Sequence, residues 1–474
     1  MSWSGYQGKA MTEFVGRTRE LAALQRAFDS TKSQLIPVFG RRRVGKSELL
    51  LHFLESHRGI YFLGKESPET LQLRELMATA AQALDEPLLA AVSLAWKESL
   101  EAIVRQWKGT EKLVVILDEF QWMVQAMPEL PSIVQELWDR QWQHENRVFV
   151  VLCGSYMGFM EREVLGSKSP LFGRRTAQIH LQPFGYQEAR AFHPGYAAAD
   201  AARTYFVCGG VPLYLKAFRD AQSVDANIRD AVMDEFSPLH REPDFLLREE
   251  LRDVANYYGV LMALAAGATK AREIAQQTGL PERSLPYYLN SLVELGYVAK
   301  RFPLVGGSST ARHVRFVLED PLLRFWFGFV YPNVSFVRQM GPQRSFDQLV
   351  RPNLPSWYGL AFERLCREAL PVLYEREGVG AAFEVGEYWD KHVQIDVVGL
   401  RKDDWTDVGE CKWGPVRSGS ALAAEIGTKA ARFPNSRGAT LGLRAFVRTA
   451  GEGTRAALEK ARVKVYELED LYGE

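Results

Sequence analysis

Two acids and a lysine near the C-terminal end have the types and spacing of a metal-dependent hydrolytic site. Glu410 and Lys412 are two positions apart in the segment DVGECKW, and Asp396 is a lone acid in the apolar segment QIDVVGL. Residues two apart in a strand point to the same face, so Glu410 and Lys412 should lie together while Cys411 points into the core. A buried carboxylate is costly unless it is paired or binds a cation. We therefore expect Asp396 and Glu410 to share Mg²⁺ or Mn²⁺ and Lys412 to hold or activate a water.

A glycine-rich loop near the N-terminal end has the pattern of a phosphate-binding loop. Residues 35–47 read LIPVFGRRRVGKS, an apolar strand that leads into the loop, and a helical segment follows. The loop N–H groups and the helix N-terminus would hold the phosphates of ATP, Lys46 would reach the β- and γ-phosphates, and Ser47 would bind Mg²⁺. The residues expected at the nucleotide are Gly40, Arg41, Arg42, Arg43, Val44, Gly45, Lys46, Ser47 and Glu48. A solvated basic loop is the alternative for the three arginines.

Two further apolar segments end in polar residues that complete such a site. Residues 113–123 read LVVILDEFQWM, a buried parallel strand that ends in Asp118 and Glu119. Ligands gather at the carboxyl ends of parallel strands. Asp118 would hold Mg²⁺ through water, and Glu119 would polarise the attacking water. The strand RVFVVLCGSYM places Ser155 at its end, either as a contact to the γ-phosphate or that water, or as an ordinary strand-end serine.

Several motifs in the first half of the chain together resemble the archaeal-type ATPase family within the AAA+ and STAND group. They are FVGR at residues 14–17, GRRRVGKS, LDEFQ, CGS, SPLFGRR and CGGVP. The resemblance implies that Asp118 and Glu119 are the Walker B acids and Ser155 the sensor-1 residue. It also implies an arginine finger at Arg174 or Arg175, acting between subunits of a homo-oligomer. A surface ion pair is the alternative for these arginines. A sensor-2 arginine is not visible, which leaves nucleotide sensing by the lid open.

The middle of the chain reads as a helical lid over residues 196–248 and a winged helix-turn-helix over residues 249–320. Three helical segments are followed by RFPLVGGSSTARHVRFVLED, two strands around a Gly/Ser turn. The candidate recognition helix holds few cations, whereas the wing carries Lys300, Arg301, Arg312 and Arg315. This module either contacts DNA or docks the ATPase on the C-terminal domain. The aromatic connector at 321–350 reads as interdomain core.

The C-terminal segment, residues 351–474, has the element order α-β-β-β-α-β. With Glu363 on the first helix and Asp396, Glu410 and Lys412 on the strands, it resembles the PD-(D/E)xK nuclease fold, and GLAFERLC and GECKW resemble the DUF234 domain. The resemblance implies metal-binding and catalytic roles for these four residues. The alternative is a salt bridge of Lys412 in an inactive relic. Further basic residues either line a phosphate track or form a solvated face; they are Lys429, Arg432, Arg437 and Arg444.

Composition describes a soluble, multidomain protein. The 474 residues suffice for roughly three or four domains. With 47% hydrophobic and 24% charged residues and zero formal net charge, nucleic-acid contact must come from local basic patches. Four scattered cysteines predict buried thiols in a reducing cytosol. We see no secretory signal, and the apolar clusters are too short to cross a membrane.

These observations predict a multidomain α/β protein with a P-loop AAA+ ATPase core at residues 1–195. The expected function is ATP binding and hydrolysis coupled to a metal-dependent nuclease that acts on DNA, with Mg²⁺ as cofactor and Mn²⁺ as an option at the nuclease site. The alternatives are an ATP-dependent signalling or defence switch, and a DNA-bound regulator, whose C-terminal domain does not cleave. The sequence leaves the nucleic-acid substrate and the pathway undetermined.

Overall fold

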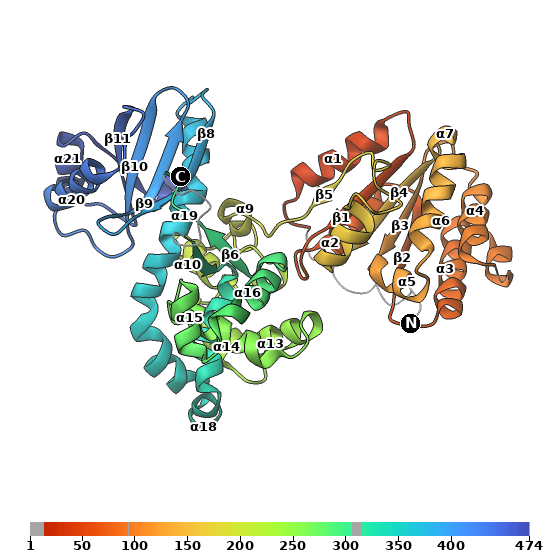
Figure 1. Cartoon of the computed structure of the whole chain (residues 1–474), viewed down its shortest axis with the longest axis horizontal. Helices are drawn as coiled ribbons and strands as arrows, with labels where there is room; N and C mark the ends of the chain where they lie inside the picture. Colours follow the sequence, from red (N-terminus) through yellow and green to blue (C-terminus); the bar gives the residue numbers. More distant parts are fainter. Residues whose placement is uncertain (1–13, 93, 306–313, 474) are drawn as a thin grey trace. The chain divides into compact units, whose positions relative to one another are not determined.

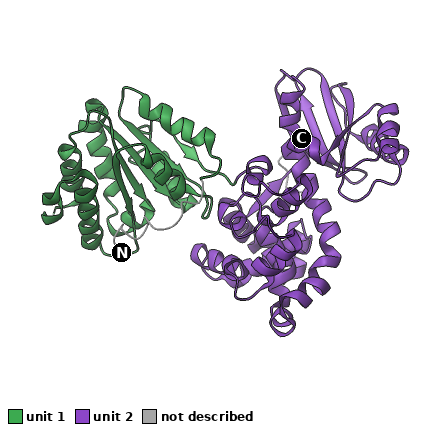
Figure 2. Cartoon of the chain, turned by 180° about the vertical axis from the view of Figure 1, so that it is seen from behind, with its two compact units in different colours: residues 1–183 green, residues 184–474 purple. Residues whose placement is uncertain are grey.

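The computed structural model describes residues 14–92, 94–305 and 314–473. The chain forms two compact units, residues 1–183 and residues 184–474 (Figure 2). Each unit is an α/β assembly with its own sheet, which confirms the predicted multidomain α/β class. Arg312, predicted on the wing, lies outside the described residues.

The first unit is built on a parallel sheet of five strands in the order β2-β3-β4-β1-β5 (Figure 1). Its three central strands, β3, β4 and β1, are buried along their whole length, as expected for a parallel sheet. The strands are β1 (Gln34–Phe39), β2 (Gly59–Leu63), β3 (Leu113–Asp118), β4 (Val148–Gly154) and β5 (Ile179–His180).

Two separate hydrophobic cores cover the two faces of this sheet, because alternate residues of each strand point to opposite sides. One core lies under α1 and α2 and contains Ile36, Val38 and Phe149. The other lies under α3, α4 and α6 and contains Leu35, Val115 and Leu152. The α-helices are α1 (Thr18–Asp29), α2 (Lys46–Glu55), α3 (Glu69–Leu84), α4 (Trp96–Gln106), α5 (Phe120–Ala126), α6 (Leu130–Leu137), α7 (Gln143–Glu145) and α8 (Met157–Phe159).

The second unit starts with a helical region that includes the helix-turn-helix. Three helices, α14 (Val254–Ala265), α15 (Ala271–Thr278) and α16 (Leu285–Glu294), precede the antiparallel hairpin of β6 (Val298–Arg301) and β7 (Arg315–Leu318). This is the predicted arrangement of three helices and a wing. The surrounding helices are α9 (Tyr186–Arg190), α10 (Ala198–Cys208), α11 (Pro212–Leu215), α12 (Val224–Asn227), α13 (Pro238–Glu250), α17 (Pro321–Phe325) and α18 (Val334–Ser345). The aromatic connector packs into the same core as these helices, with Phe325, Trp326 and Phe327 buried.

A mixed sheet of five strands, in the order β12-β11-β10-β9-β8, forms the C-terminal part of this unit. The long helix α19 (Leu354–Arg376) packs on one face, and α20 (Gly419–Arg432) and α21 (Glu452–Lys460) cover apolar residues of the other. The strand order along the chain matches the prediction. The remaining elements are β8 (Phe383–Trp389), β9 (Gln394–Arg401), β10 (Trp405–Lys412), β11 (Thr440–Val447), β12 (Val463–Glu467) and α22 (Leu468–Tyr472).

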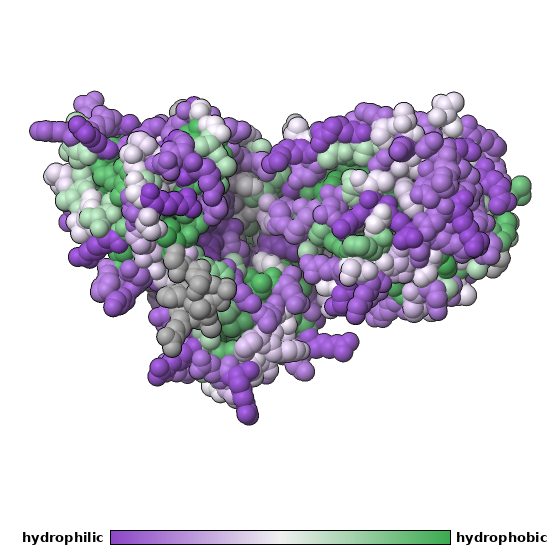
Figure 3. Space-filling model, turned by 45° about the horizontal axis from the view of Figure 1, so that its top comes forward, coloured by the Kyte–Doolittle hydropathy of each residue, from purple (hydrophilic) through white to green (hydrophobic). Residues whose placement is uncertain are grey.

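The face of the chain drawn in Figure 3 is largely hydrophilic, with small apolar patches between the charged side chains. Among the described residues, no helix combines the length and the apolar character that a membrane crossing requires.

Candidate active sites

The loop after β1 is shaped by two glycines and by an inward-pointing lysine. A Cβ atom at Gly40 would lie 2.3 Å from the carbonyl oxygen of Leu181, so only glycine fits there. Gly45, with φ of 91°, precedes the first residue of α2. The Lys46 ammonium is buried and donates to the carbonyl oxygens of Gly40 (2.9 Å) and Arg41 (3.1 Å). The sequence therefore folds the loop around the lysine expected to meet the phosphates.

Ser47 and Asp118, the two residues expected at Mg²⁺, are in direct contact. The Ser47 hydroxyl donates to Oδ2 of Asp118 at 2.6 Å, and the Asp118 side chain is fully buried. Tyr61, which sequence reasoning missed, donates to the same oxygen at 2.5 Å from the adjacent strand β2. Burial and the charge of Asp118 raise the pKa of the Tyr61 hydroxyl, so it stays a donor.

Glu119 is held at the carboxyl end of β3 by two polar side chains. Its backbone is left-handed, with φ of 51°, an unusual conformation for a glutamate. Ser155, at the end of β4, donates to Oε2 of Glu119 at 2.7 Å. Gln121 donates to the same oxygen and was not identified from the sequence. The structure thus brings Asp118, Glu119 and Ser155 to one edge of the sheet, as expected for parallel strands.

The two candidate finger arginines lie at the opposite edge of this sheet. Thr176, which follows them, donates its N–H to the carbonyl of Leu35 at the start of β1, whereas the phosphate loop follows the end of β1. Arg174 is committed to a two-pronged pair with Asp139, with both distances 2.7 Å, and this pair lowers the pKa of Asp139. Arg175 makes a long contact, 3.4 Å, to the carbonyl of Leu165. Neither arginine is near the phosphate loop of its own chain.

The predicted acids of the C-terminal domain come together on β9 and β10, beside α19. Asp396 and Glu410 are 6% and 4% exposed. The Cys411 N–H donates to Oδ2 of Asp396 at 3.0 Å, which ties β10 to the acid on β9. Lys412 donates to Oε1 of Glu410 at 2.8 Å, so these two side chains do share a face.

The three acids share raised pKa values, and burial is the largest cause for each of them. Burial, followed by the charge of Asp396, raises the pKa of Glu363 to about 7. The same two causes raise the pKa of Glu410 to about 7, although Lys412 and Lys429 oppose the rise. Burial also raises the pKa of Asp396. A nearby cation favours the charged form of a buried carboxyl group and so lowers its raised pKa.

The cluster differs from the open, cation-bridged cleft that the sequence predicts. Lys429, on α20, donates to Oε2 of Glu410, so each oxygen of this acid is held by a lysine. Lys412 also contacts Glu425 at 3.0 Å rather than lying free beside the acids. Within the described parts of the chain, no three His, Cys, Asp or Glu side chains converge closely enough to hold a metal ion. The donors are hard oxygens suited to Mg²⁺ or Mn²⁺, but Glu410 must give up a lysine before it can bind one.

The raised pKa of Glu363 predicts how the stability of the folded protein depends on pH. The folded protein holds a proton that the unfolded chain releases above about pH 4.5, so stability falls as pH rises from 4.5 to 7. Glu363→Gln should therefore raise the melting temperature at pH 8 and leave it unchanged at pH 4. The gain is at most roughly 3 kcal/mol, since a tenfold change in proton affinity corresponds to about 1.4 kcal/mol. The exposed Glu384→Gln is the control, and an equal effect of both variants at pH 8 would contradict the prediction.

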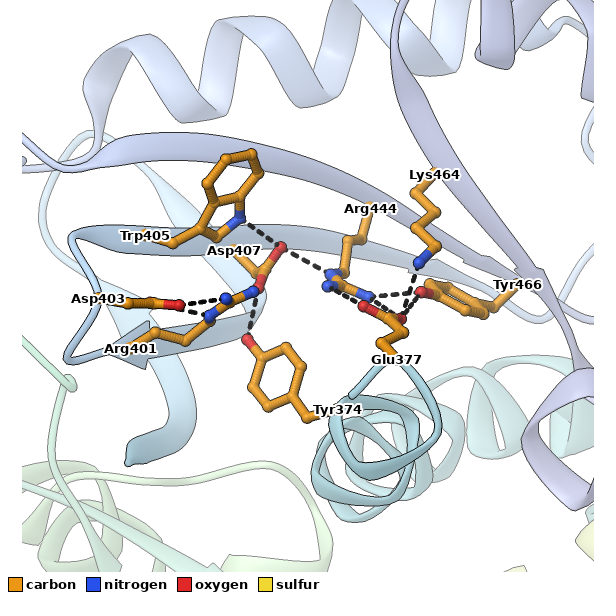
Figure 4. A network of polar contacts seen from close by, with 9 residues as sticks. All are labelled: Tyr374, Glu377, Arg401, Asp403, Trp405, Asp407, Arg444, Lys464 and Tyr466. Carbon is orange, nitrogen blue, oxygen red and sulfur yellow. Dashed lines mark hydrogen bonds and ion pairs between the residues drawn. The ribbon is translucent and has the colours of Figure 1, made fainter. Parts of the chain in front are cut away.

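Arg444 does not contribute to a phosphate track. It is 4% exposed and donates to Asp407 (2.7 Å) and to Glu377 (2.8 and 2.9 Å), as Figure 4 shows. Burial raises the pKa of Glu377, but Arg444 and Tyr466 outweigh it and hold that pKa at about 2. The reason is the strand register: Arg444 lies opposite Gly409 and beside Asp407, on the face covered by α19. The guanidinium of Arg444 is therefore occupied by acids of its own domain.

Three family profiles match successive parts of the chain. The ATPase domain found predominantly in Archaea matches residues 14–218, the IclR helix-turn-helix domain matches residues 255–301, and DUF234, a domain of archaeal and bacterial proteins of unknown function, matches residues 326–423.

Individual relatives match the chain over very different lengths. An uncharacterized protein of Methanocaldococcus jannaschii is 27% identical over 395 residues, 82% of this chain and 85% of that protein. An uncharacterized ATP-binding protein of the same organism is 47% identical over 45 residues, 10% of this chain and 76% of that protein. Among solved structures, the Walker-type ATPase of Pyrococcus abyssi is similar with a TM-score of 0.52 and 17% identity, over 66% of this chain and 96% of that one.

The likeness to the Pyrococcus abyssi protein concerns the fold. The family profiles divide this chain at the same places as the sequence motifs do. The phosphate loop falls inside the first match, α15, α16 and β6 fall inside the second, and β8, β9 and β10 fall inside the third; β7, β11 and β12 lie outside these matches. This chain therefore combines an ATPase domain of the archaeal type with a helix-turn-helix segment and a C-terminal DUF234 domain.

Proposed function

We propose that the first unit binds ATP with Mg²⁺ and hydrolyses it. The observation that carries this proposal is the 2.6 Å contact between Ser47 and Asp118, which joins the phosphate loop to the end of β3. A serine at a helix start and a buried aspartate are the ligands that hold Mg²⁺ in P-loop NTPases, where the ion neutralises phosphate charge. Tyr61 would orient Asp118, since its hydroxyl holds the same carboxylate oxygen.

Each remaining residue at this edge has a role in the proposal. Lys46, released from the carbonyls of the loop, would bind the β- and γ-phosphates. Glu119 would accept a proton from the attacking water and orient it. Ser155 and Gln121, which hold one oxygen of Glu119, would position that carboxylate.

Glu119→Gln tests the catalytic assignment. The amide keeps the shape of the side chain but cannot act as a base, so ATP affinity should change little while hydrolysis falls by at least about 100-fold. Phosphate release and fluorescent-nucleotide binding measure the two quantities separately. Glu129→Gln, an exposed glutamate of the same unit, is the control. Hydrolysis by Glu119→Gln at the wild-type rate would show that another group activates the water.

We further propose that Arg175 is an arginine finger that acts on the ATP of a second copy. Leu35, beside the arginines, and Phe39, before the phosphate loop, are about 13 Å apart at 3.3 Å per residue. This separation runs along β1, so Arg175 lies at the end of the strand away from the chain's own phosphate loop. Arg175 suits the role better than Arg174, because Arg174 would have to leave its two-pronged pair with Asp139.

Mixing variants tests the finger. Arg175→Ala should lower hydrolysis about tenfold or more at nearly unchanged ATP affinity, since an arginine finger stabilises the transition state. Adding Lys46→Ala protein should restore activity, because its intact Arg175 can reach the functional ATP site of the other variant. Arg105→Ala, a 74% exposed arginine on α4, should behave as wild type. A monomer with full ATPase activity would rule the finger out.

For the C-terminal domain we propose metal-dependent cleavage of nucleic acid, with DNA as the expected substrate. Support comes from the placement of Asp396 and Glu410 on neighbouring strands, with Glu363 on the adjoining helix and Lys412 beside Glu410. Asp396 and Glu410 would hold Mg²⁺ or Mn²⁺, which supplies a nucleophilic water and neutralises phosphate charge. The helix-turn-helix segment is the expected source of DNA contact.

A second candidate is an ATP-dependent switch whose C-terminal domain binds a partner without cleaving it. One observation favours it: both oxygens of Glu410 are already neutralised by Lys412 and Lys429. A relic site would keep such internal ion pairs. The two candidates differ in one property, because only the nuclease must bind a divalent cation at Asp396.

A further inference from the structure

The wing hairpin of the helix-turn-helix packs against the C-terminal sheet. The Leu304 N–H donates to the carbonyl oxygen of Glu387 at 2.9 Å, and a Cβ at Gly386 would lie 3.3 Å from the Leu304 side chain. Both partners belong to β8, an edge strand of the C-terminal sheet. The segment after β6 therefore covers a sheet edge that would otherwise present unpaired backbone groups.

Arg301 of the wing starts a chain of charged contacts that ends at the acidic cluster. Its guanidinium donates to both oxygens of Glu319 (2.9 and 3.2 Å) and lies 3.5 Å from Oε1 of Glu387. Arg367, on α19, lies 3.9 Å from the other oxygen of Glu387 and donates to the backbone carbonyl of Asp396 at 2.7 Å. Glu387 is thus shared between a wing arginine and the arginine that holds the backbone of Asp396.

A second wing arginine contacts the C-terminal domain independently. The Arg315 guanidinium lies 4.3 Å from the centre of the Trp389 ring and 3.3 Å from the side-chain oxygen of Gln394. Trp389 ends β8, and Gln394 starts β9 two residues before Asp396. A guanidinium above an aromatic ring is attracted by the negative face of the ring. Arg301, the last residue of β6, and Arg315, the first residue of β7, are therefore both engaged inside the chain.

We propose that the paired strands β6 and β7, through Arg301 and Arg315, position the acidic cluster rather than contact nucleic acid. Arg301 and Arg315 act as positioning residues. Arg301 holds the side chain of Glu387, and Arg315 holds the start of β9. Arg367 contacts both Glu387 and the backbone of Asp396, so a displacement of Glu387 also displaces Asp396. The chemistry at Asp396 rests on the proposed function, whereas the mechanical link does not. Because the hairpin continues from α16, a ligand that shifts the helix-turn-helix changes the environment of Asp396, and the coupling must work in both directions.

Hydrogen exchange in the full-length protein tests the link without reference to activity. The Cys411 N–H reports on Asp396, because it donates to that carboxylate, and the Leu304 N–H reports on the wing contact. Arg301→Ala should speed exchange in peptides that contain either residue by about tenfold. Arg315→Ala should do the same, and Arg301→Lys should restore protection in part. Lys300→Ala is the matched control, since Lys300 is exposed and contacts Asn290.

Faster exchange confined to the wing, with the Cys411 peptide unchanged, would overturn the proposal. Binding of a short DNA duplex at several salt concentrations gives the second test. The proposal expects Arg301→Ala and Arg315→Ala to bind within about twofold of wild type, with the same salt dependence. A tenfold loss with a salt slope reduced by about 1 would identify phosphate contacts and overturn it. If wild type binds no DNA, the proposed substrate fails while the exchange result still decides the link.

Discussion

Lys46→Ala should abolish detectable ATP binding. The Lys46 ammonium is the group that the loop carries inward, and its two hydrogen bonds to loop carbonyls show where it can reach. Charge-assisted hydrogen bonds to phosphate contribute roughly 1.5–3 kcal/mol each. Loss of two such bonds weakens binding by at least about 100-fold. Isothermal titration with a non-hydrolysable ATP analogue measures this directly.

The control for Lys46→Ala is Lys65→Ala in the same unit. Lys65 is half exposed and pairs with Glu75 at 2.6 Å, so its loss should change neither ATP affinity nor folding appreciably. Circular dichroism of both variants checks that the fold is retained. An ATP affinity for Lys46→Ala within threefold of wild type, about 0.65 kcal/mol, would contradict the assignment of the phosphate site.

Asp396→Asn should remove divalent-cation binding by the C-terminal domain together with any cleavage. The amide oxygen can still accept the Cys411 N–H, so the strand contact remains while the negative charge is lost. We expect Mn²⁺ affinity to fall by about 100-fold or more, because hard cations bind charged carboxylates. ATP hydrolysis should be unchanged, since the residues proposed for it all belong to the other unit.

Asp403→Asn is the control for that experiment. Asp403 lies in the turn between β9 and β10 and pairs with Arg401 away from the acidic cluster. Mn²⁺ binding measured by electron paramagnetic resonance separates loss of the cation from loss of the fold. Wild-type Mn²⁺ affinity in Asp396→Asn would place the cation elsewhere, and the C-terminal domain would then be a docking module.

The nucleotide site was predictable because its residues follow one another in short motifs. Gly40, Lys46 and Ser47 belong to one loop, and Asp118 ends an apolar strand, so pattern and topology together predict their meeting. Tyr61 was not predictable in this way, because its contact with Asp118 depends on the register of β2 beside β3. The contact of Gln121 with Glu119 was not predictable either. It depends on the local backbone, which is left-handed at Glu119.

The C-terminal cluster was predicted in position but not in its charge balance. The alternation of strands places Glu410 and Lys412 on one face. Whether Lys429 reaches Glu410 depends on how α20 packs over the sheet, which no local pattern determines. Arg444 could have been found: Asp407 shares the inward face of Cys411, and a buried acid requires a cation on a neighbouring strand.

The role of the wing could not be predicted from local sequence either. Its basic residues are as compatible with DNA as with the protein surface, and the sequence left both options open. In the structure, the pairing of Arg301 with Glu319 and Glu387 and the stacking of Arg315 on Trp389 use these charges inside the chain. The contacts of these two arginines with β8 and β9 join residues about 70–90 positions apart, so they depend on the tertiary fold rather than on local spacing.

The most direct test of the account is DNA cleavage by the full-length protein, with Mn²⁺, in the presence and absence of ATP. Wild type, Lys46→Ala and Glu410→Gln would be incubated with plasmid, linear duplex and single-stranded DNA. The account predicts Mn²⁺-dependent products from wild type, a rate that ATP alters only when Lys46 is present, and no products from Glu410→Gln. Equal cleavage by wild type and Glu410→Gln, or none by wild type in any condition, would contradict it.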